Sequence, residues 1–292
     1  MNKKFEIITA GFVVIIVIGA LIFANVKGTL NKSENIFAEG DITSSKESIV
    51  KEFIPSDDLV NFNIDVSNAS LEIIKTDEKE IKIQCTNNNN SKYRIRQRDN
   101  EIIIEKKERF RLLKWNNRGD NIKIEIPSTL IATIEADTSN GTIILNDIEA
   151  NNIDIGTSNG QISIENVNAK EDIEIETSNG KIEVTNLSAE NIILDSSNSQ
   201  AVLNNINGKE IKVDTSNAEI KINECIGNKV VLDTSNGEIE AYECYAKDIK
   251  LDTSNADITL ENLNDKDFII EDLEVSTSNA SENINANYNN KK

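Results

Sequence analysis

Apolar residues recur along the second half of the chain in a pattern that repeats about every 19 residues. In each repeat an apolar–polar–apolar run is followed by a lone apolar residue, a small residue and a second alternating run. Alternation with a period of two is typical of strands with one buried face. Equivalent apolar positions fall into columns, the first being Ile143, Ile162, Ile182, Ala201, Ile220, Ile239 and Ile258. The pattern predicts two strands in each repeat, with like residues stacked on like.

The tripeptide Thr/Ser-Ser-Asn marks each of these repeats. A fixed period of this length is the signature of a solenoid. We therefore predict an all-β chain that forms a parallel β-solenoid of about 19-residue repeats, spaced about 4.8 Å apart. A right-handed coil is expected, and a run of antiparallel hairpins is the alternative. The marking asparagines, predicted to form a structural turn ladder, are Asn140, Asn159, Asn179, Asn198, Asn217, Asn236, Asn255 and Asn279.

Two properties explain an asparagine at the mark. Asparagine tolerates the left-handed backbone conformation and hydrogen-bonds its own turn. Stacked carboxamides can also bond to their equivalents above and below. The residue that follows varies among Gly, Ala and Ser, which indicates that the asparagine itself meets the special requirement.

The chain begins with two lysines and a long apolar run. Residues 7–24 carry no charge, and a run of this length after basic residues is typical of a membrane-spanning helix. We expect residues 1–4 to be cytoplasmic, residues 5–26 to form an uncleaved single-pass anchor, and residues 27–47 to form a flexible linker. The bulk of the chain is then extracytoplasmic, at a bacterial cell membrane. A cleaved signal peptide is the alternative.

The rest of the chain divides into three parts. Residues 48–136 are expected to form an irregular β module that continues and caps the coil, residues 137–282 the regular solenoid, and residues 283–292 a disordered polar tail. Asn68 resembles an early mark, and the 72 residues between it and Asn140 suggest close to four turns with insertions. Strands are predicted in this module at 59–66, 70–76, 79–86, 92–98, 101–107, 121–127 and 131–137.

Composition narrows the functional classes. The net charge is −19, which opposes nucleic-acid binding because phosphates require a basic surface. The chain has no histidine, so Ser-His or Cys-His catalysis and His-ligated zinc are excluded. No catalytic residue, cofactor or resident metal is expected.

Acidic residues recur three positions before the mark. In a coil these carboxylates would form a column about 4.8 Å apart. One hypothesis is that divalent cations bridge the column, because carboxylate oxygens suit Ca²⁺. The other is that each carboxylate accepts a backbone hydrogen bond and water screens the rest. The speculative cation column is Asp195, Asp214, Asp233 and Asp252.

One segment of this acidic chain is basic and aromatic. The run KKERFRLLKWNNRG holds the only tryptophan. It is either a surface that docks on anionic lipid head groups or wall polymers, or a hairpin loop whose charges keep a sheet edge soluble. The residues of this speculative anionic-surface site are Lys107, Arg109, Arg111, Lys114 and Trp115.

Cys225 and Cys244 lie 19 residues apart and share one core column. Their Cα atoms are expected about 5 Å apart, a spacing that permits a disulfide. Two buried thiols acting as small apolar side chains are the alternative.

The motifs VSNAS, IKIEIPSTLIATIEADTSNG and the repeated TSNG/TSNA units resemble the bacterial DUF4097 family over about residues 55–285. That family is also described as an adhesin candidate or "toastrack" β-repeat domain. The resemblance implies a β-solenoid-like domain tied to the cell envelope, often associated with envelope stress, without known enzymatic activity or defined catalytic residues.

Three functions are compatible with these features. The first is a non-enzymatic binding or scaffold role at the envelope, with envelope proteins or wall polymers as partners. The second is a carbohydrate-active enzyme on a parallel β-helix, which would need paired carboxylates and long loops that interrupt the repeat. The third is ice or surface binding through a flat column of threonines.

Overall fold

The computed structural model describes residues 48–55, 58–86, 92–107, 119–265 and 267–289. These residues form strands and no helix. The predicted anchor at 5–26, the linker at 27–47 and residues 290–292 of the predicted tail lie outside this part of the chain. Within it, no helix has the length and apolar character needed to cross a bilayer.

The first nine strands make the irregular module and the first regular turn. They are β1 (Ser48–Phe53), β2 (Leu59–Val66), β3 (Ala69–Thr76), β4 (Ile81–Thr86), β5 (Lys92–Arg98), β6 (Glu101–Lys107), β7 (Asp120–Pro127), β8 (Ile131–Thr138) and β9 (Ile143–Asn146). The bounds of β2 to β8 agree with the predicted strands to within two residues, whereas β1 was not predicted.

The remaining strands build the regular stack. They are β10 (Glu149–Thr157), β11 (Ile162–Ala169), β12 (Asp172–Thr177), β13 (Ile182–Ser196), β14 (Ala201–Thr215), β15 (Ile220–Thr234), β16 (Ile239–Thr253), β17 (Ile258–Glu261), β18 (Asp272–Thr277) and β19 (Glu282–Asn285).

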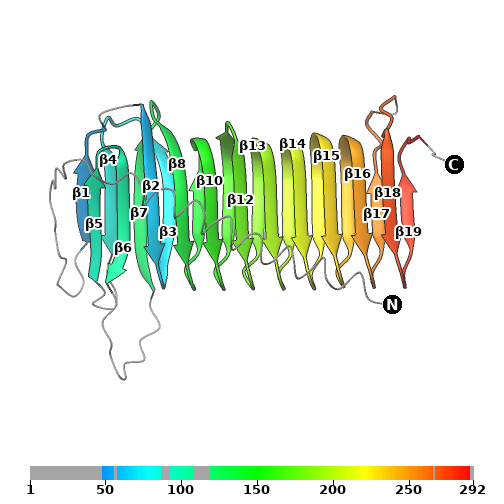
Figure 1. Ribbon diagram of the computed structural model, residues 1–292, viewed down its shortest axis with the longest axis horizontal. Coiled ribbons are helices and arrows are strands. Elements are labelled where there is room, and N and C mark those ends of the chain that lie inside the picture. The colour runs from blue at the N-terminus through cyan, green and yellow to red at the C-terminus, as the bar shows by residue number, and fades with distance from the viewer. Residues whose placement is uncertain (1–47, 56–57, 87–91, 108–118, 266, 290–292) are drawn as a thin grey trace, which may run out of the picture. The chain divides into compact units, whose positions relative to one another are not determined.

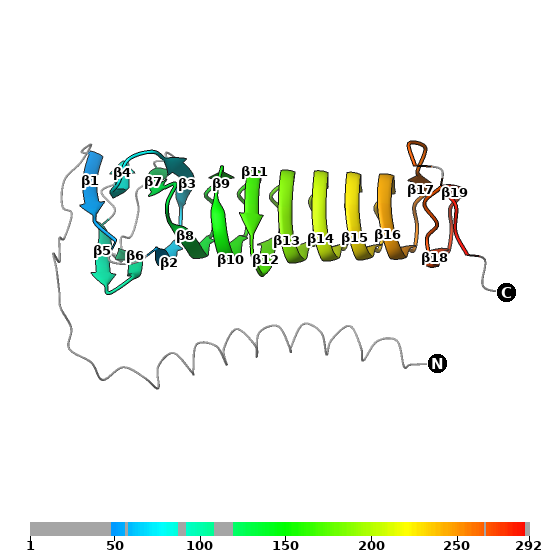
Figure 2. The ribbon, with the colours of Figure 1, turned by 90° about the horizontal axis from the view of Figure 1, so that it is seen from above.

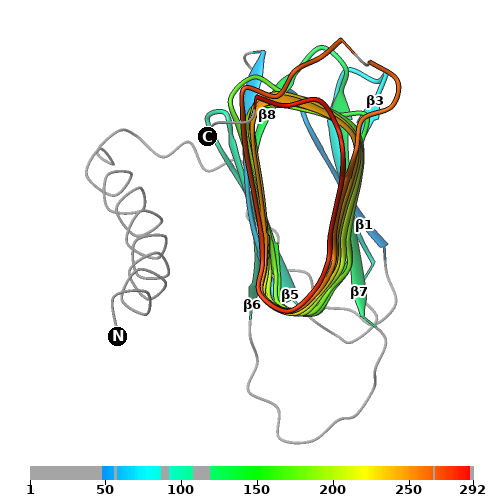
Figure 3. The same cartoon turned by 90° about the vertical axis from the view of Figure 1, so that its right-hand side faces the viewer.

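Successive repeats stack in parallel with equivalent residues opposite each other. Ile182 pairs with Ala201, Ala201 with Ile220, and Ile220 with Ile239. Each of β13 to β16 bends at a corner and contributes to both walls, so that one coil follows the next along the stack (Figure 1). The view along the stack shows the coils superposed as a flattened closed outline (Figure 3). The predicted parallel stacking is confirmed, and the hairpin alternative is wrong for the regular repeats.

The interior of the outline is filled by the predicted aliphatic columns. Ile162, Ile182 and Ile220 are each 0% exposed. Side chains alternate between buried and partly exposed along β14 and β15 because successive residues of a strand point to opposite faces. Stacking equivalent repeats thus buries one continuous core.

The irregular module departs from the expected succession of turns. β2 lies between β6 and β8, and β3 lies between β7 and β9, all in parallel. The coil of β2 and β3 is therefore directly adjacent to that of β8 and β9. The prediction that about four turns separate Asn68 from Asn140 is wrong, because most of the intervening chain builds the end of the stack.

That end of the stack is antiparallel. β5 pairs antiparallel with β6, and β4 pairs antiparallel with both β1 and β7. Seen from above, β1 and β5 stand at the extreme end of the stack (Figure 2). The core is closed here, since Ile83, Tyr93 and Ile95 are 0% exposed.

Candidate functional site

The threonines of the marks from Thr138 to Thr253 are buried in the corner, and most of their hydroxyls are hydrogen-bonded. The Thr157 hydroxyl donates to the Gly141 carbonyl oxygen of the preceding coil at 3.2 Å and accepts from the Gly160 amide at 3.1 Å. Thr253 donates likewise to the Gly237 carbonyl oxygen at 3.0 Å. The residue therefore closes its own turn and ties one coil to the next. These threonines are at most 7% exposed, so they cannot form the flat solvent-facing column that ice binding requires.

The asparagines of the marks form a ladder along the outside of the corner. Asn159 Nδ2 donates to Asn140 Oδ1 at 2.8 Å, and Asn179 Nδ2 donates to Asn159 Oδ1 at 2.9 Å. The same bond joins each later pair up to Asn279, and Asn140 bonds to Asn68. The asparagines also bond to a serine carbonyl of the preceding coil, as Asn236 does to Ser216 at 3.4 Å. The ladder is structural.

The left-handed conformation is found at the other corner. None of the marking asparagines has a positive φ; the residues that do are Asp99 at a hairpin turn and, in the coils, Asp147, Asn166, Asn186, Asn205, Glu224 and Glu243, with φ between 50° and 57°. The expectation that the marking asparagines adopt the left-handed conformation is therefore wrong, because that conformation lies at the opposite corner. Four of these residues make a second ladder: Asn166 donates to Asp147 at 3.0 Å, Asn186 to Asn166 at 2.7 Å and Asn205 to Asn186 at 2.8 Å.

The residue after the mark also meets a requirement of its own. A Cβ on Gly160 would lie 1.7 Å from the Gly141 carbonyl oxygen, and one on Gly180 would lie 1.5 Å from that of Gly160. Neither glycine has a positive φ, so close approach of two backbones, and not φ, demands glycine here. The inference that only the asparagine is constrained is wrong for these coils.

The predicted acid column is aligned. Asp195, Asp214, Asp233 and Asp252 lie opposite one another in consecutive coils. Partial burial raises the pKa of Asp214, as does repulsion from Asp195, whereas Lys212, 3.8 Å away, lowers it. Across the described ranges no three acidic or cysteine side chains converge as metal ligands would. Lys212 and Lys250, two positions before Asp214 and Asp252, supply positive charge near this column and oppose the rise that burial causes in the pKa of Asp233.

A tighter acid cluster surrounds Asp154 on the same wall. Asp154 lies opposite Glu135 on one side and Glu174 on the other. Its side chain reaches solvent, yet its pKa is raised to about 7. The larger cause is partial desolvation, and the smaller is repulsion from Glu174, Asp137, Glu135 and Glu176. Charge repulsion is concentrated here because neither neighbouring strand supplies a lysine opposite Asp154.

Replacing Asp154 by asparagine is expected to stabilise the protein at neutral and higher pH. A carboxyl whose pKa is raised on folding binds more protons in the folded state, so its penalty is absent near pH 4 and grows as pH rises towards 7. Because the side chain is solvated, we expect a gain of about 1 kcal/mol at pH 8 and none at pH 4. Urea unfolding at both pH values measures the gain. Glu190→Gln, which neutralises an exposed acid elsewhere, is the matched control. An equal gain in stability from this variant would show that the effect comes from the change in net charge and not from the acid cluster.

The predicted basic aromatic site lies almost wholly outside the described residues. Arg109, Arg111, Lys114 and Trp115 are outside them, and Lys107 is described only as the last residue of β6. Next to it is a buried polar cluster that the sequence pattern did not reveal. The Tyr93 hydroxyl donates to Asp120 Oδ2 at 2.7 Å, and Lys106 Nζ lies 3.7 Å from the same oxygen. Tyr93 stands on an apolar position of its strand, and only its neighbours in space identify it as a polar partner.

Cys225 and Cys244 lie opposite each other in β15 and β16 as free, fully buried thiols. A hydrogen bond between them and burial raise the pKa of Cys244. Cys85 is also buried, and burial followed by repulsion from Asp120 raises its pKa to about 12. The structure thus has the two thiols as apolar fillers of the column.

All three thiols are expected to be unreactive in the folded protein, because thiolate is the reactive form and burial suppresses it. Titration with a chromogenic thiol reagent should give no reaction within an hour in buffer and three thiols per chain in urea. One thiol per chain in urea would indicate a Cys225–Cys244 disulfide instead.

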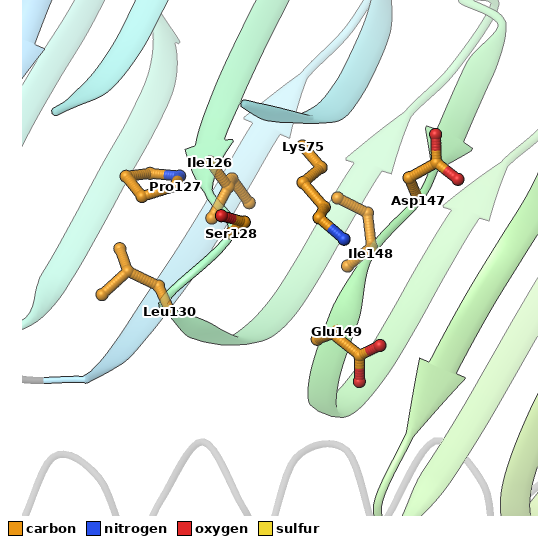
Figure 4. A pocket seen from close by; sticks show the side chains of 8 residues that line it. All are labelled: Lys75, Ile126, Pro127, Ser128, Leu130, Asp147, Ile148 and Glu149. Atoms are coloured by element: carbon orange, nitrogen blue, oxygen red, sulfur yellow. The ribbon is translucent and has the colours of Figure 1, made fainter. Parts of the chain in front are cut away.

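A shallow pocket lies where the turn after β7 meets the corner after β9. Its cavity volume is about 10 Å³, room for about one water molecule and far below the roughly 300–1,000 Å³ of typical small-molecule sites. Lys75 extends between the Pro127 turn and the corner at Ile148 and Glu149 (Figure 4). The lining offers one base, two acids and aliphatic surface, without a nucleophile and base in contact, so it supports no catalytic assignment.

The chain matches one protein-family model and is similar to two solved structures. The family model described as Toastrack DUF4097 matches residues 60–230 and 169–291. A candidate cell adhesion protein from Clostridium sporogenes is similar in structure with 15% identity and a TM-score of 0.35, covering 68% of this chain and 99% of its own. An adhesin candidate from Bacteroides fragilis has 12% identity and a TM-score of 0.45, covering 83% and 99%. No curated protein matches in sequence.

Proposed function

This chain belongs to the Toastrack DUF4097 family, and on that premise we propose that it is a non-enzymatic, adhesin-like scaffold of the bacterial cell envelope. The observation that carries the proposal is the unbroken stack of coils tied by the asparagine ladder and filled by aliphatic side chains. Such a stack gives long, rigid, solvated faces, which suit binding to extended partners.

We also propose where in the cell the protein is located. The uncharged run within residues 5–26 is proposed to anchor the chain as a single pass, with residues 1–4 in the cytoplasm and the stack outside. Envelope proteins or wall polymers are then the proposed partners. A net charge of −19 favours partners other than nucleic acid.

The buried thiols permit a clean test of this topology. In the full chain, Lys209→Cys places a thiol at an exposed position of β14, whereas the three native cysteines are buried. A membrane-impermeant maleimide should label this variant in intact bacterial protoplasts. Asn2→Cys, in the predicted cytoplasmic segment, should be labelled only after the membrane is opened. Recovery in the membrane fraction after a salt wash tests the anchor itself.

Two outcomes would contradict the proposed location. Labelling of Lys209→Cys only after lysis would place the stack inside the cell. Recovery of the protein in the culture medium, with the first residues removed, would show that the apolar run is a cleaved signal.

The basic aromatic segment is proposed to dock on an anionic surface. Lys107, Arg109, Arg111, Lys114 and Trp115 combine charge with the only tryptophan, the combination that favours an anionic interface. Anionic liposomes should retain the native protein more strongly than an Arg109/Arg111/Trp115 triple alanine variant, and neutral liposomes should retain neither. Equal retention of the two proteins on anionic liposomes would reject the proposal.

The enzymatic alternative depends on the acid cluster around Asp154. A carboxyl with a pKa of about 7 beside other carboxyl groups resembles the acid–base pairs of glycoside hydrolysis. Asp154, however, is exposed on the outer wall of β10, and it does not line the shallow pocket at Lys75. We expect no release of reducing ends from wall polysaccharides. Release that Asp154→Asn abolishes would overturn the non-enzymatic proposal.

A further inference from the structure

The two ends of the described stack present different edge strands. At one end, β5 pairs with β6 alone and β1 with β4 alone among the strands of the described residues. At the other end, β18 pairs with β16 alone and β19 with β17 alone. Figure 1 shows these strands at opposite ends of the stack. Edge strands are templates for pairing with another chain.

The charges of the two ends are complementary. The strand β5, KYRIRQR, has four basic residues and no acid, and β1, SIVKEF, has one base and one acid, so this edge is basic in a chain whose net charge is −19. The strands β18 and β19, DLEVST and ENIN, have three acids between them and no base. Glu274 and Glu282 of these strands are exposed. Opposite charges directly across a pair of strands stabilise the pairing.

The structure already contains an example of the pairing that β5 favours. On its inner side β5 meets β6, where Arg96 forms an ion pair with Glu105 at 2.8 Å and Arg98 lies opposite Glu101. A second acidic strand on the outer side of β5 would repeat this arrangement. The strand β18 has six residues and β5 has seven, so their lengths match.

At the acidic end the described residues cover the core only in part. Ile249, Leu251 and Leu260 are at most 1% exposed in one coil. In the next coil, Leu273 and Ile284 continue the same columns but are only partly buried. At the basic end, Val50 and Ile54 are 45% and 74% exposed. Joining the two ends would remove apolar surface of both from water.

Strand directions permit the joint. The strand β18 runs parallel to the wall that contains β2 and β6, and β5 runs antiparallel to β6. The strand β1 is antiparallel to β4, which is antiparallel to β7, so that β1 runs parallel to β7 and to the wall that ends in β19. Two copies translated along the stack therefore present β18 antiparallel to β5 and β19 parallel to β1.

We propose that the acidic edge of one copy, β18 and β19, pairs with the basic edge of a second copy, β5 and β1, so that chains associate head to tail. Pairing of two acidic edges with each other is disfavoured, because it would set Glu274 and Glu282 against like charges. A head-to-tail contact is heterologous and stays open at both ends, so that it continues into chains of copies. This inference concerns the stack alone and does not rest on where the protein is located.

Crosslinking of the full chain tests this contact. Ser276→Cys marks β18 and Gln97→Cys marks β5 without altering a charge, and the native thiols are buried. The proteins are held in a mild detergent with micelles in large excess. The bismaleimide has a spacer of about 20 Å, the length of a six-residue strand, so no register is assumed. A mixture of the two variants should give dimers, each variant alone should give none, and the double variant should give a ladder of multimers.

Salt and charge reversal distinguish a specific contact between these edges from crosslinking by random collision of chains. Dimer yield in the mixture should fall at least fivefold between about 50 mM and 0.5 M NaCl, because exposed ion pairs are screened. Glu274→Lys on the Ser276→Cys chain should lower the yield as strongly, and Glu190→Lys, which reverses an exposed charge of β13, should not.

Three results would overturn the proposal. The first is a mixture that gives no more dimer than the single variants, and the second is Ser276→Cys alone crosslinking as well as the mixture, which would indicate a joint between two acidic edges. The third is an equal effect of Glu274→Lys and Glu190→Lys. Sedimentation of the unmodified chain at both salt concentrations is independent of the variants, and a monomer throughout would also refute the contact.

Discussion

Replacing Asp120 by alanine is expected to destabilise the protein by about 3 kcal/mol, because it breaks a buried polar cluster from its centre. Asp120 is 1% exposed and accepts the Tyr93 hydroxyl at 2.7 Å, with the Lys106 ammonium 3.7 Å away. Without the carboxylate, a buried hydroxyl loses this acceptor and a mostly buried ammonium loses its counter-charge. Urea unfolding followed by circular dichroism measures the change.

Two further variants show how much of this loss of stability comes from the hydrogen bond and how much from removing any acid. Tyr93→Phe removes one hydrogen bond and keeps the ring, so a loss of about 1 kcal/mol is expected. Asp248→Ala removes an exposed acid of β16 and should be within about 0.5 kcal/mol of the native protein. If Asp120→Ala is no more destabilising than Asp248→Ala, the cluster does not hold the end of the stack together.

Gly180→Ala is expected to cost about 3 kcal/mol, although it adds a single methyl group at a corner. The new Cβ would lie 1.5 Å from the Gly160 carbonyl oxygen of the preceding coil, a contact that only a backbone shift relieves. Such a shift also strains the adjoining bonds of the corner, where Asn179 donates to Asn159 at 2.9 Å and the Gly180 amide donates to Thr177 at 3.0 Å. The midpoint of urea unfolding reports the loss.

Ser199→Ala is the matched substitution one coil further along. Ser199 follows the mark Asn198 and already carries a Cβ, so this change should cost less than about 0.5 kcal/mol. Native stability in Gly180→Ala would show that the corner of Gly180 can adopt the backbone geometry of the Ser199 coil, and that the close approach is not obligatory.

The register of the regular coils was predictable from the sequence because each column repeats the same chemistry at a constant spacing. Once Ile162 is assigned inward, the period assigns Ile182 and Ile220 inward as well, and the pairings follow. The asparagine ladder follows from the same argument, since residues at equal positions in stacked coils are neighbours. A shift by one residue would turn every apolar column to solvent.

The corners were less predictable, because their requirements come from neighbouring backbone. The marking asparagines suggested a left-handed turn, yet that conformation lies at Asp147, Asn166 and their equivalents. The need for Gly160 and Gly180 comes from carbonyl oxygens of other coils. Neither fact leaves a pattern within a single repeat.

The sequence by itself determined the parallel stack of coils between residues 137 and 282, its aliphatic interior, its polar exterior and the alignment of Asp195 to Asp252, because all of these follow from a constant period. Only the tertiary structure decided that Asn68 lies next to Asn140, that Tyr93 meets Asp120, and that the stack ends in a basic edge and an acidic edge. Those contacts join residues far apart in the chain across segments without a repeat. Their pairing is set by which strands fold back on which.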